Sequence, residues 1–157
     1  QKNIWGQNSD IPEGASSIKE LARVASSQGI TISIENSGQP IRALHMLVEM
    51  CRDSLPNNLG NFLGLCPDPA NQIGKQPGMD PLEDLAKLPL DMLKIVHFKQ
   101  IRNGNILPTV ESGELDCSAM VQILKSKQYK GPAIFEIPSS QNVFGNLSTS
   151  FDYIQNF

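Results

Sequence analysis

Four short apolar runs alternate along the chain with longer segments whose apolar residues recur every three or four positions. The runs cover residues 30–35 (ITISIE), 62–68 (FLGLCPD), 92–99 (MLKIVHFK) and 132–137 (PAIFEI). Runs of this length favour strands, and the spacing between them favours amphipathic helices. Strands that alternate with helices form successive βα units, so the pattern predicts an α/β fold with a parallel sheet. The 157 residues are expected to form one domain over residues 1–157.

Capping and helix-breaking residues predict where the helices begin and end. Ser17 and Glu20 form a capping-box pattern that predicts the start of the first helix, and Gly29 predicts its end. Residues 3–5 are predicted to be the tail of a strand that leads into a loop. The other helices are predicted to begin near Pro40, after Asp80 and after Asp116, with a last one within residues 147–157.

Each of the four predicted strands carries an ionisable residue at or near its C-terminal end. These residues are Glu35, Asp68, His97 and Glu136, each about one βα unit from the next. Because the C-terminal ends of parallel strands open onto one face, we expect the four side chains to converge. Burying a carboxylate without a partner costs on the order of several kcal/mol, and one divalent cation would satisfy all four groups.

The donor types limit which metals suit such a site. Three carboxylates and one imidazole form an oxygen-rich ligand set that suits Mn²⁺, Mg²⁺ or Co²⁺. Structural zinc sites, by contrast, are built mainly from thiolates. Zn²⁺ is a further candidate, and the sequence does not choose among these metals.

Alternation within the first run indicates which side chains face the site. In residues 30–35 the isoleucines occupy the even positions, and Thr31, Ser33 and Glu35 occupy the odd ones. Successive strand residues point to opposite faces of a sheet. We therefore expect the isoleucines to pack under helices and the polar set to line the interior of a barrel.

Composition and charge narrow the range of partners. The formal net charge is −3 and the sequence pI about 5.3, whereas proteins that bind nucleic-acid phosphates are normally basic. No apolar run approaches the roughly 18 residues of a membrane helix, and no signal-peptide pattern opens the chain, so we expect a cytoplasmic protein without membrane contact. The 3 cysteines are well separated and lack a CxxC pair, which predicts buried thiols rather than a disulfide framework.

The order of these motifs resembles that of the xylose isomerase-like TIM barrels, the AP endonuclease family 2 superfamily. The motifs are ITISIEN with Glu35, LGLCPDPAN with Asp68, IVHFKQI with His97, SGELD before a predicted helix, and YKGPAIFEI with Glu136. The family includes sugar-phosphate isomerases and epimerases, ketose 3-epimerases, hydroxypyruvate isomerases, inosose dehydratases and endonuclease IV. The resemblance implies that the chain is the C-terminal half of a (β/α)₈ barrel, with the four runs as approximately its fifth to eighth strands.

The resemblance also implies a function and a role for each strand-end residue. The function is that of a divalent-metal-dependent sugar or sugar-phosphate isomerase or epimerase, which removes a proton next to a carbonyl by way of an enediolate. By the same resemblance Glu35, Asp68, His97 and Glu136 are metal ligands, and Glu35 and Glu136 also form the acid/base pair. Return of the proton on one face gives isomerisation, and return on the opposite face gives epimerisation.

Four more residues are candidate substrate contacts. Lys99 and Arg102 lie close to His97 in the sequence and are suited to hold a carboxylate or phosphate. Asn71 stands three residues after Asp68, where family members often carry histidine, and this departure weakens the likeness to ketose 3-epimerases. Trp5 is suited to cover a sugar ring at the mouth of the site.

Other functions remain open on the sequence alone. A dehydratase of the same family, acting on an inosose-like or dehydroshikimate-like substrate, would begin with the same proton abstraction and then lose a β-hydroxyl. A non-catalytic sugar-binding protein on a barrel scaffold is another alternative. The nuclease branch is disfavoured because it needs three metals, many histidines and a basic surface, and this chain has 2 histidines.

The length of the chain bears on its partners. A whole (β/α)₈ barrel has about 250 residues, so we expect a fragment that lacks the first four strands and has little activity by itself. Four parallel strands leave open edges that need cover. We therefore expect the chain to form a homodimer or to associate with the missing half barrel.

Overall fold

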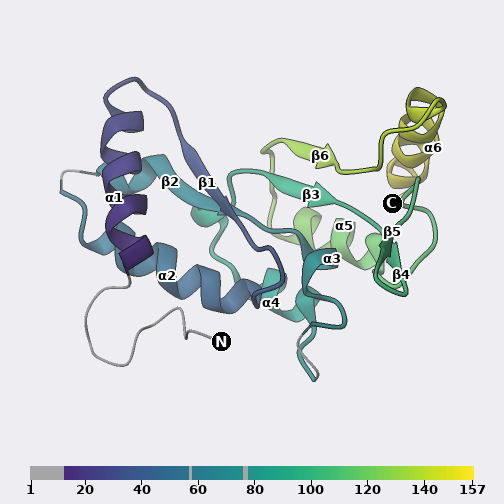
Figure 1. Ribbon diagram of the computed structural model, residues 1–157, viewed down its shortest axis with the longest axis horizontal. Coiled ribbons are helices and arrows are strands. Elements are labelled where there is room, and N and C mark those ends of the chain that lie inside the picture. The colour runs from purple at the N-terminus through teal and green to yellow at the C-terminus, as the bar shows by residue number, and fades with distance from the viewer. Residues whose placement is uncertain (1–12, 57, 76–77) are drawn as a thin grey trace.

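The computed structural model describes residues 13–56, 58–75 and 78–157, and Figure 1 shows how their helices and strands are arranged. The strands are β1 (Ile32–Glu35), β2 (Leu63–Cys66), β3 (Val96–Phe98), β4 (Ile101–Arg102), β5 (Asn105–Ile106) and β6 (Ala133–Phe135). The α-helices are α1 (Glu13–Ser26), α2 (Ile41–Asp53), α3 (Pro69–Gln72), α4 (Pro81–Lys87), α5 (Cys117–Ser126) and α6 (Val143–Gln155). Short 3₁₀ helices, η1 (Leu59–Phe62) and η2 (Leu90–Met92), precede β2 and β3.

Four of the strands run parallel in the order β1-β2-β3-β6. β1 pairs with β2 through Ile32 opposite Leu63, and β3 pairs with β6 through Val96 opposite Ala133. The two pairs are joined by a parallel bridge between Leu65 and the segment before β3. Helices connect the strands in sequence, as Figure 1 shows. The predicted α/β fold with parallel strands is confirmed, and each strand is shorter than its apolar run.

The helix boundaries agree with the sequence at some ends and differ at others. α2, α4 and α5 begin at the predicted places, and Gly29 follows the end of α1 with φ +67. The capping-box prediction at Ser17 is wrong, because α1 already begins at Glu13. The last helix also begins earlier than predicted, at Val143. The first turns of α1 and α6 each contain a glycine and a polar residue of modest helix propensity. This composition led to the prediction of a loop at both places.

Helix α2 has its first turn capped by residues from other elements. Pro40 stands at its N-cap and offers no side-chain acceptor. Instead, the backbone N–H of Ile41 donates to Oε1 of Gln72 at 3.0 Å, and that of Arg42 donates to Oδ2 of Asp84 at 3.4 Å. Asp84 is 1% exposed and also accepts from the Nε of Arg42 at 2.6 Å. These contacts, with the one from Gln72 to Asp84, tie the start of α2 to the end of α3 and to α4.

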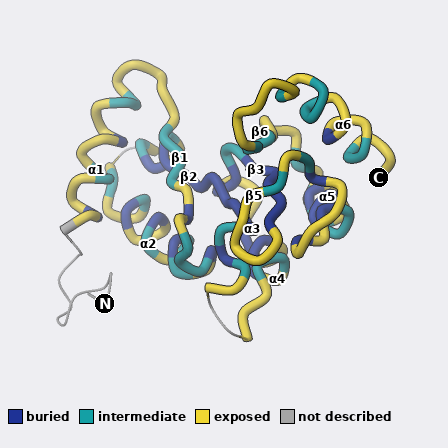
Figure 2. Tube along the Cα trace, turned by 45° about the vertical axis from the view of Figure 1, so that its right-hand side comes forward, coloured by how far each residue is buried: buried dark blue, intermediate teal, exposed yellow. Residues whose placement is uncertain are grey.

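The core lies between the strands and the helices that cover one of their faces. Figure 2 shows the buried residues concentrated along β2, β3 and α5. Among the largest fully buried side chains are Ile41, Val48, Leu63, Leu65, Leu85, Leu88, Val96, Val110 and Met120. The free cysteines Cys51, Cys66 and Cys117 are all buried, as predicted. No helix in the described part of the chain is long and apolar enough to cross a membrane.

Two features at the outer strands depart from the predicted pattern. Ile32 and Ile34 pack against the core, but Ile30 precedes β1 and is 56% exposed, so its predicted place under a helix is wrong. At the other outer strand, β6 and α6 expose apolar side chains: Ile134 is 45% exposed and Phe144 83%. The predicted strand tail at residues 3–5 lies outside the described residues.

The sequence reading missed a hairpin directly after β3. β4 and β5 pair antiparallel, with Ile101 opposite Ile106, and Asn103 and Gly104 form the turn with φ values of +51 and +75. An Asn-Gly pair with both residues at positive φ is the usual sequence of a tight two-residue hairpin turn. The missed helix α3 begins at Pro69 and is capped by the side chain of Asp68, which accepts from the N–H of Asn71.

Candidate metal centre

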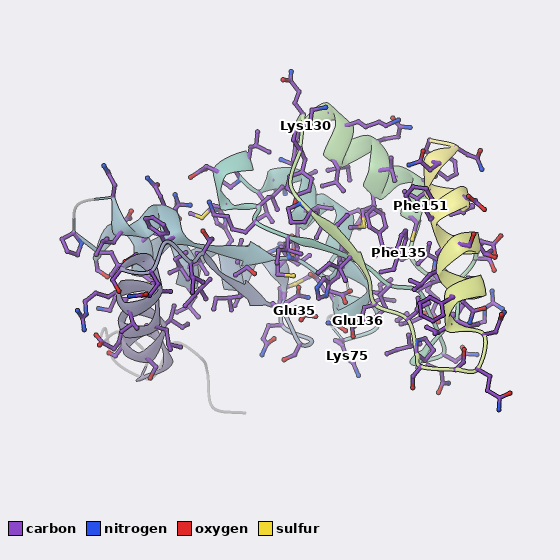
Figure 3. The ribbon with its side chains drawn as sticks, turned by 90° about the horizontal axis from the view of Figure 1, so that it is seen from above. Glu35, Lys75, Lys130, Phe135, Glu136 and Phe151 are labelled. Carbon is purple, nitrogen blue, oxygen red and sulfur yellow. The ribbon has the colours of Figure 1, made fainter. Side chains whose placement is uncertain are left out.

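The four predicted strand-end residues lie together. Glu35 is the last residue of β1, Asp68 follows β2, His97 lies in β3, and Glu136 follows β6. Each offers one ligand atom, and these atoms lie within 4.8 Å of one another. Figure 3 shows Glu35 and Glu136 near each other at the centre of the molecule. The parallel strand order causes this convergence, because it places all four C-terminal ends on one side.

His97 occupies the middle of the cluster. Its Nδ1 lies 3.1 Å from Oε2 of Glu136, 3.4 Å from Oε1 of Glu35 and 4.0 Å from Oδ2 of Asp68. The backbone N–H of His97 donates to the carbonyl of Pro67 at 3.1 Å, which fixes β3 against the end of β2. One imidazole nitrogen is therefore within reach of all three carboxylates.

Burial divides the four side chains into two pairs. The Asp68 side chain is 0% exposed and that of His97 is 15% exposed. The Glu35 and Glu136 side chains are 38% and 42% exposed. Asp68 and His97 thus form the floor of the site, while Glu35 and Glu136 are accessible to a small molecule.

Lys99 lies among the carboxylates rather than in a solvent-exposed loop. Its Nζ is 2.8 Å from Oδ2 of Asp68 and 2.9 Å from Oε1 of Glu136, and the residue is 3% exposed. Burial lowers the pKa of Lys99, but the close ion-pair contacts with these two carboxylates outweigh it and raise the pKa above its ordinary value. Lys99 is therefore a permanent positive charge at the edge of the site.

Asp68 is held tightly, and one of its oxygens points into the site without a hydrogen bond. Its backbone N–H donates to Oδ1 of Asn36 at 2.9 Å, and its Oδ1 accepts from the N–H of Asn71 at 3.2 Å. Its Oδ2 is buried and near the Lys99 ammonium, but that contact lacks hydrogen-bond geometry. Burial raises the pKa of Asp68, and Lys99 opposes this rise without cancelling it.

Asn71 connects the site to its surroundings. Its Nδ2 donates to Oε1 of Glu35 at 3.1 Å and to the carbonyl of Asn36 at 2.9 Å. Its Oδ1 accepts from the Nζ of Lys99 at 2.9 Å. Because the amide group is used on both sides, Asn71 fixes the orientations of Glu35 and Lys99 relative to each other.

Glu136 is ionised more readily than an ordinary glutamate. Burial raises its pKa, but the close ion pair with Lys99 and attraction to His97 together lower the pKa below the ordinary value. The carboxylate of Glu136 is accordingly charged at neutral pH and available to accept a proton or bind a cation.

A cavity of about 620 Å³ opens beside the cluster. Three loops at the C-terminal strand ends form its walls: the loop after β1, the segment through α3 to Lys75, and the β4–β5 hairpin with the segment that follows it. Asn71 and Lys99 line the cavity and also contact the cluster, so the cavity adjoins the cluster through these two side chains. The geometry is that of a cation site adjoining a pocket for a small molecule.

Comparison with known proteins shows the family of the fold. A family model described as xylose isomerase-like TIM barrel matches residues 3–157. The chain belongs to the xylose isomerase-like TIM barrel family. Comparison with curated proteins gives no match.

Solved structures of similar fold include members of this family. The xylose isomerase domain protein from Planctomyces limnophilus has a TM-score of 0.71 and 19% identity, over 94% of this chain and 54% of that one. The IOLI protein with a binding zinc atom has a TM-score of 0.60 and 17% identity, over 90% and 52%. D-allulose 3-epimerase from Methylomonas sp. in complex with D-allulose has a TM-score of 0.60 and 22% identity, over 88% and 46%. This chain thus spans about half the length of the xylose isomerase-like structures it matches.

The remaining substrate-contact candidates of this family member fall in different places. Lys99 and Asn71 line the cavity, whereas Arg102 is exposed, does not line it, and donates from Nη2 to the carbonyl of Ser112 at 3.5 Å. Trp5 lies outside the described residues.

Sequence reasoning missed Lys75 and the hairpin turn as parts of the cavity wall. The Asn103-Gly104 pair would have revealed the hairpin. No local signal distinguishes Lys75, because its place depends on how the segment after α3 folds.

Proposed function

We propose that this chain supplies the metal-binding and proton-transferring side of a divalent-metal-dependent isomerase or epimerase of sugars or sugar phosphates. The observation that carries the proposal is the convergence of Glu35, Asp68, His97 and Glu136, whose ligand atoms lie within 4.8 Å of one another. Membership of the xylose isomerase-like family supports it. The cavity beside the cluster has a volume suited to a small molecule.

The residues fit a divalent cation. Three carboxylates face one ammonium, so the cluster keeps a negative charge, and Oδ2 of Asp68 is buried without a hydrogen bond. Mn²⁺, Mg²⁺ and Co²⁺ suit this oxygen-rich set, and Zn²⁺ suits its imidazole. The zinc atom named in the IOLI structure supports a divalent metal in this fold. When bound, the metal polarises the substrate carbonyl and stabilises the negative charge that proton removal creates.

The accessible glutamates suit proton transfer, while the buried pair suits metal binding. Glu35 and Glu136 have side chains 38% and 42% exposed, so each can touch a substrate carbon, whereas Asp68 is fully covered. Glu136 has a lowered pKa and is therefore ionised, as a general base must be. One carboxylate removes the proton next to the carbonyl, and the other returns a proton to the opposite face or to the neighbouring carbon.

Turnover and hydrogen exchange in the whole protein that contains this chain test the proposal. With Mn²⁺ present, ketoses, ketose phosphates and inososes are incubated in D₂O, and deuterium uptake next to the carbonyl is followed by NMR. Glu35→Gln and Glu136→Gln should each lower turnover by about 100-fold or more, because general acid–base catalysis contributes that much. The control Glu83→Gln alters an exposed carboxylate in α4 and should change nothing.

Metal binding is measured separately by calorimetry with Mn²⁺ alone. Asp68→Ala should abolish binding, since it removes the fully buried ligand. Full turnover by either glutamine variant, or an absence of binding of Mn²⁺, Mg²⁺, Co²⁺ and Zn²⁺, would refute the proposal.

A further inference from the structure

The cavity beside the metal centre extends well past the four strand-end residues. It runs from Asn71 and Lys99, at the edge of the cluster, to Lys75 and to the turn of the β4–β5 hairpin. A ligand whose reacting atoms lie at the cluster would therefore have its far end between the segment after α3 and the hairpin.

Most of the charges in this cavity already have partners. Lys99 is paired with Asp68 and Glu136, and the carboxylate of Glu114 accepts from the backbone N–H of Asn103. Lys75 differs, because within the described ranges 13–56, 58–75 and 78–157 no carboxylate forms an ion pair with it. Among the described residues Lys75 thus brings a positive charge without an ion-pair partner to the wall of the cavity, where the Glu114 carboxylate is bonded to the hairpin backbone.

The position of Lys75 is set by its surroundings. It follows Gly74, whose φ of +70 reverses the chain after α3. A side chain at Gly38 would meet the Cγ of Lys75 at 3.8 Å, so the aliphatic part of the lysine lies close to the loop after β1. Figure 3 shows Lys75 on the same side of the molecule as Glu35 and Glu136, and Lys130 at the opposite side.

Resting on the proposed function, we propose that Lys75 binds an anionic substituent, a phosphate or a carboxylate, at the end of the substrate remote from the reacting carbon. A lysine ammonium is a compact charge with three donors and suits either group. Ser37 and the hairpin turn supply polar groups along the same cavity for the hydroxyls between the two ends. The substrate class is then an acidic sugar derivative rather than a neutral sugar. Arg102, the other cation near the strand end, does not line this cavity.

The test is equilibrium binding by calorimetry to the whole protein, with D-fructose, D-fructose 6-phosphate and D-fructuronate as probes. We expect one of the two anions to bind roughly 10-fold or more tightly than D-fructose, as a charged hydrogen bond would give. Which anion binds more tightly distinguishes phosphate from carboxylate recognition. Lys75→Gln should remove the preference and leave the affinity for D-fructose unchanged, and Lys75→Arg should retain the preference.

The matched control is Lys130→Gln, an exposed lysine before β6 and remote from the cavity, which should bind all three probes as the wild type does. Equal affinity for the neutral and anionic probes in the wild type, or an anion preference that survives Lys75→Gln, would overturn the inference. Deuterium exchange on the same probes separates the two proposals. If deuterium is taken up but the anionic probes bind no more tightly than D-fructose, only the role of Lys75 is refuted. If the anionic probes bind more tightly in a way that depends on Lys75 but no sugar takes up deuterium, only the proposed function is refuted.

Discussion

Replacing Asp84 by alanine should destabilise the protein far more than its position on a surface helix suggests. Its side chain is 0% exposed, and it accepts from Nε2 of Gln72 at 3.2 Å as well as from Arg42. Gln72 is 1% exposed, so its amide would lose an acceptor that water cannot replace. Leaving a buried donor unsatisfied costs about 1–3 kcal/mol.

A second part of the loss comes from the start of α2. The backbone N–H of Arg42, in the first turn of α2, would lose the Asp84 carboxylate that caps it. Loss of a helix cap costs about 0.5–2 kcal/mol. The Arg42 side chain is 46% exposed and regains water, so its ion pair adds little. Together these effects predict a decrease of about 1.5–5 kcal/mol in the free energy of unfolding.

Urea denaturation followed by far-UV circular dichroism measures this decrease from the transition midpoint and slope. Asp84→Asn keeps one acceptor oxygen and should lose less. The control is Asp91→Ala, which removes an ion pair to Arg52 from a side chain that is 66% exposed. That loss should be below about 1 kcal/mol. Equal stability of Asp84→Ala and Asp91→Ala would show that the contacts joining α2, α3 and α4 do not stabilise the fold.

Three further predictions concern a cap, a glycine and an exposed surface. Asp116→Ala should cost about 1 kcal/mol, because Asp116 caps α5. A hydrogen bond from the N–H of Ala119 lowers the pKa of Asp116 below its ordinary value of 3.8. The Asp116 cap therefore contributes to the free energy of unfolding above that pH, and the contribution is lost as the pH falls below it. Urea midpoints of Asp116→Ala and the wild type at about pH 6 and about pH 2 check this. Gly113→Ala should cost about 1–3 kcal/mol in thermal unfolding, because its Cβ would collide with the buried side chain of Gln100. The isolated chain should self-associate with increasing concentration through its apolar surface at β6 and α6, and Phe144→Ser should reduce this in light scattering; a concentration-independent monomer would contradict it.

The sequence predicted the convergence of the four strand-end residues better than it predicted the cavity. Glu35, Asp68, His97 and Glu136 each lie at or near the C-terminal end of an apolar run, and parallel strand order suffices to bring such positions together. The cavity depends on Lys75 and on the β4–β5 hairpin, which belong to the connections between strands. Connections follow local turn chemistry rather than the periodicity that identified the strands.

Three helix starts were predictable from a local signal, a capping aspartate or a proline. Asp80 and Asp116 accept from N–H groups of the helices they precede, as their sequence positions indicated. Pro40 correctly indicated the start of α2, but the groups that cap this helix, Gln72 and Asp84, lie far along the chain and could not be predicted. Ser17 had the right pattern in the wrong place, since helix formation extends one turn ahead of it to Glu13.

The carboxylate of Asp68 performs two tasks with its two oxygens. Oδ1 starts helix α3 by accepting from Asn71, while Oδ2 faces the cation site. The Asn71 side chain of the same helix contacts both Glu35 and Lys99. A substitution at Asp68 therefore alters two things at once, the start of α3 and one wall of the candidate cation site.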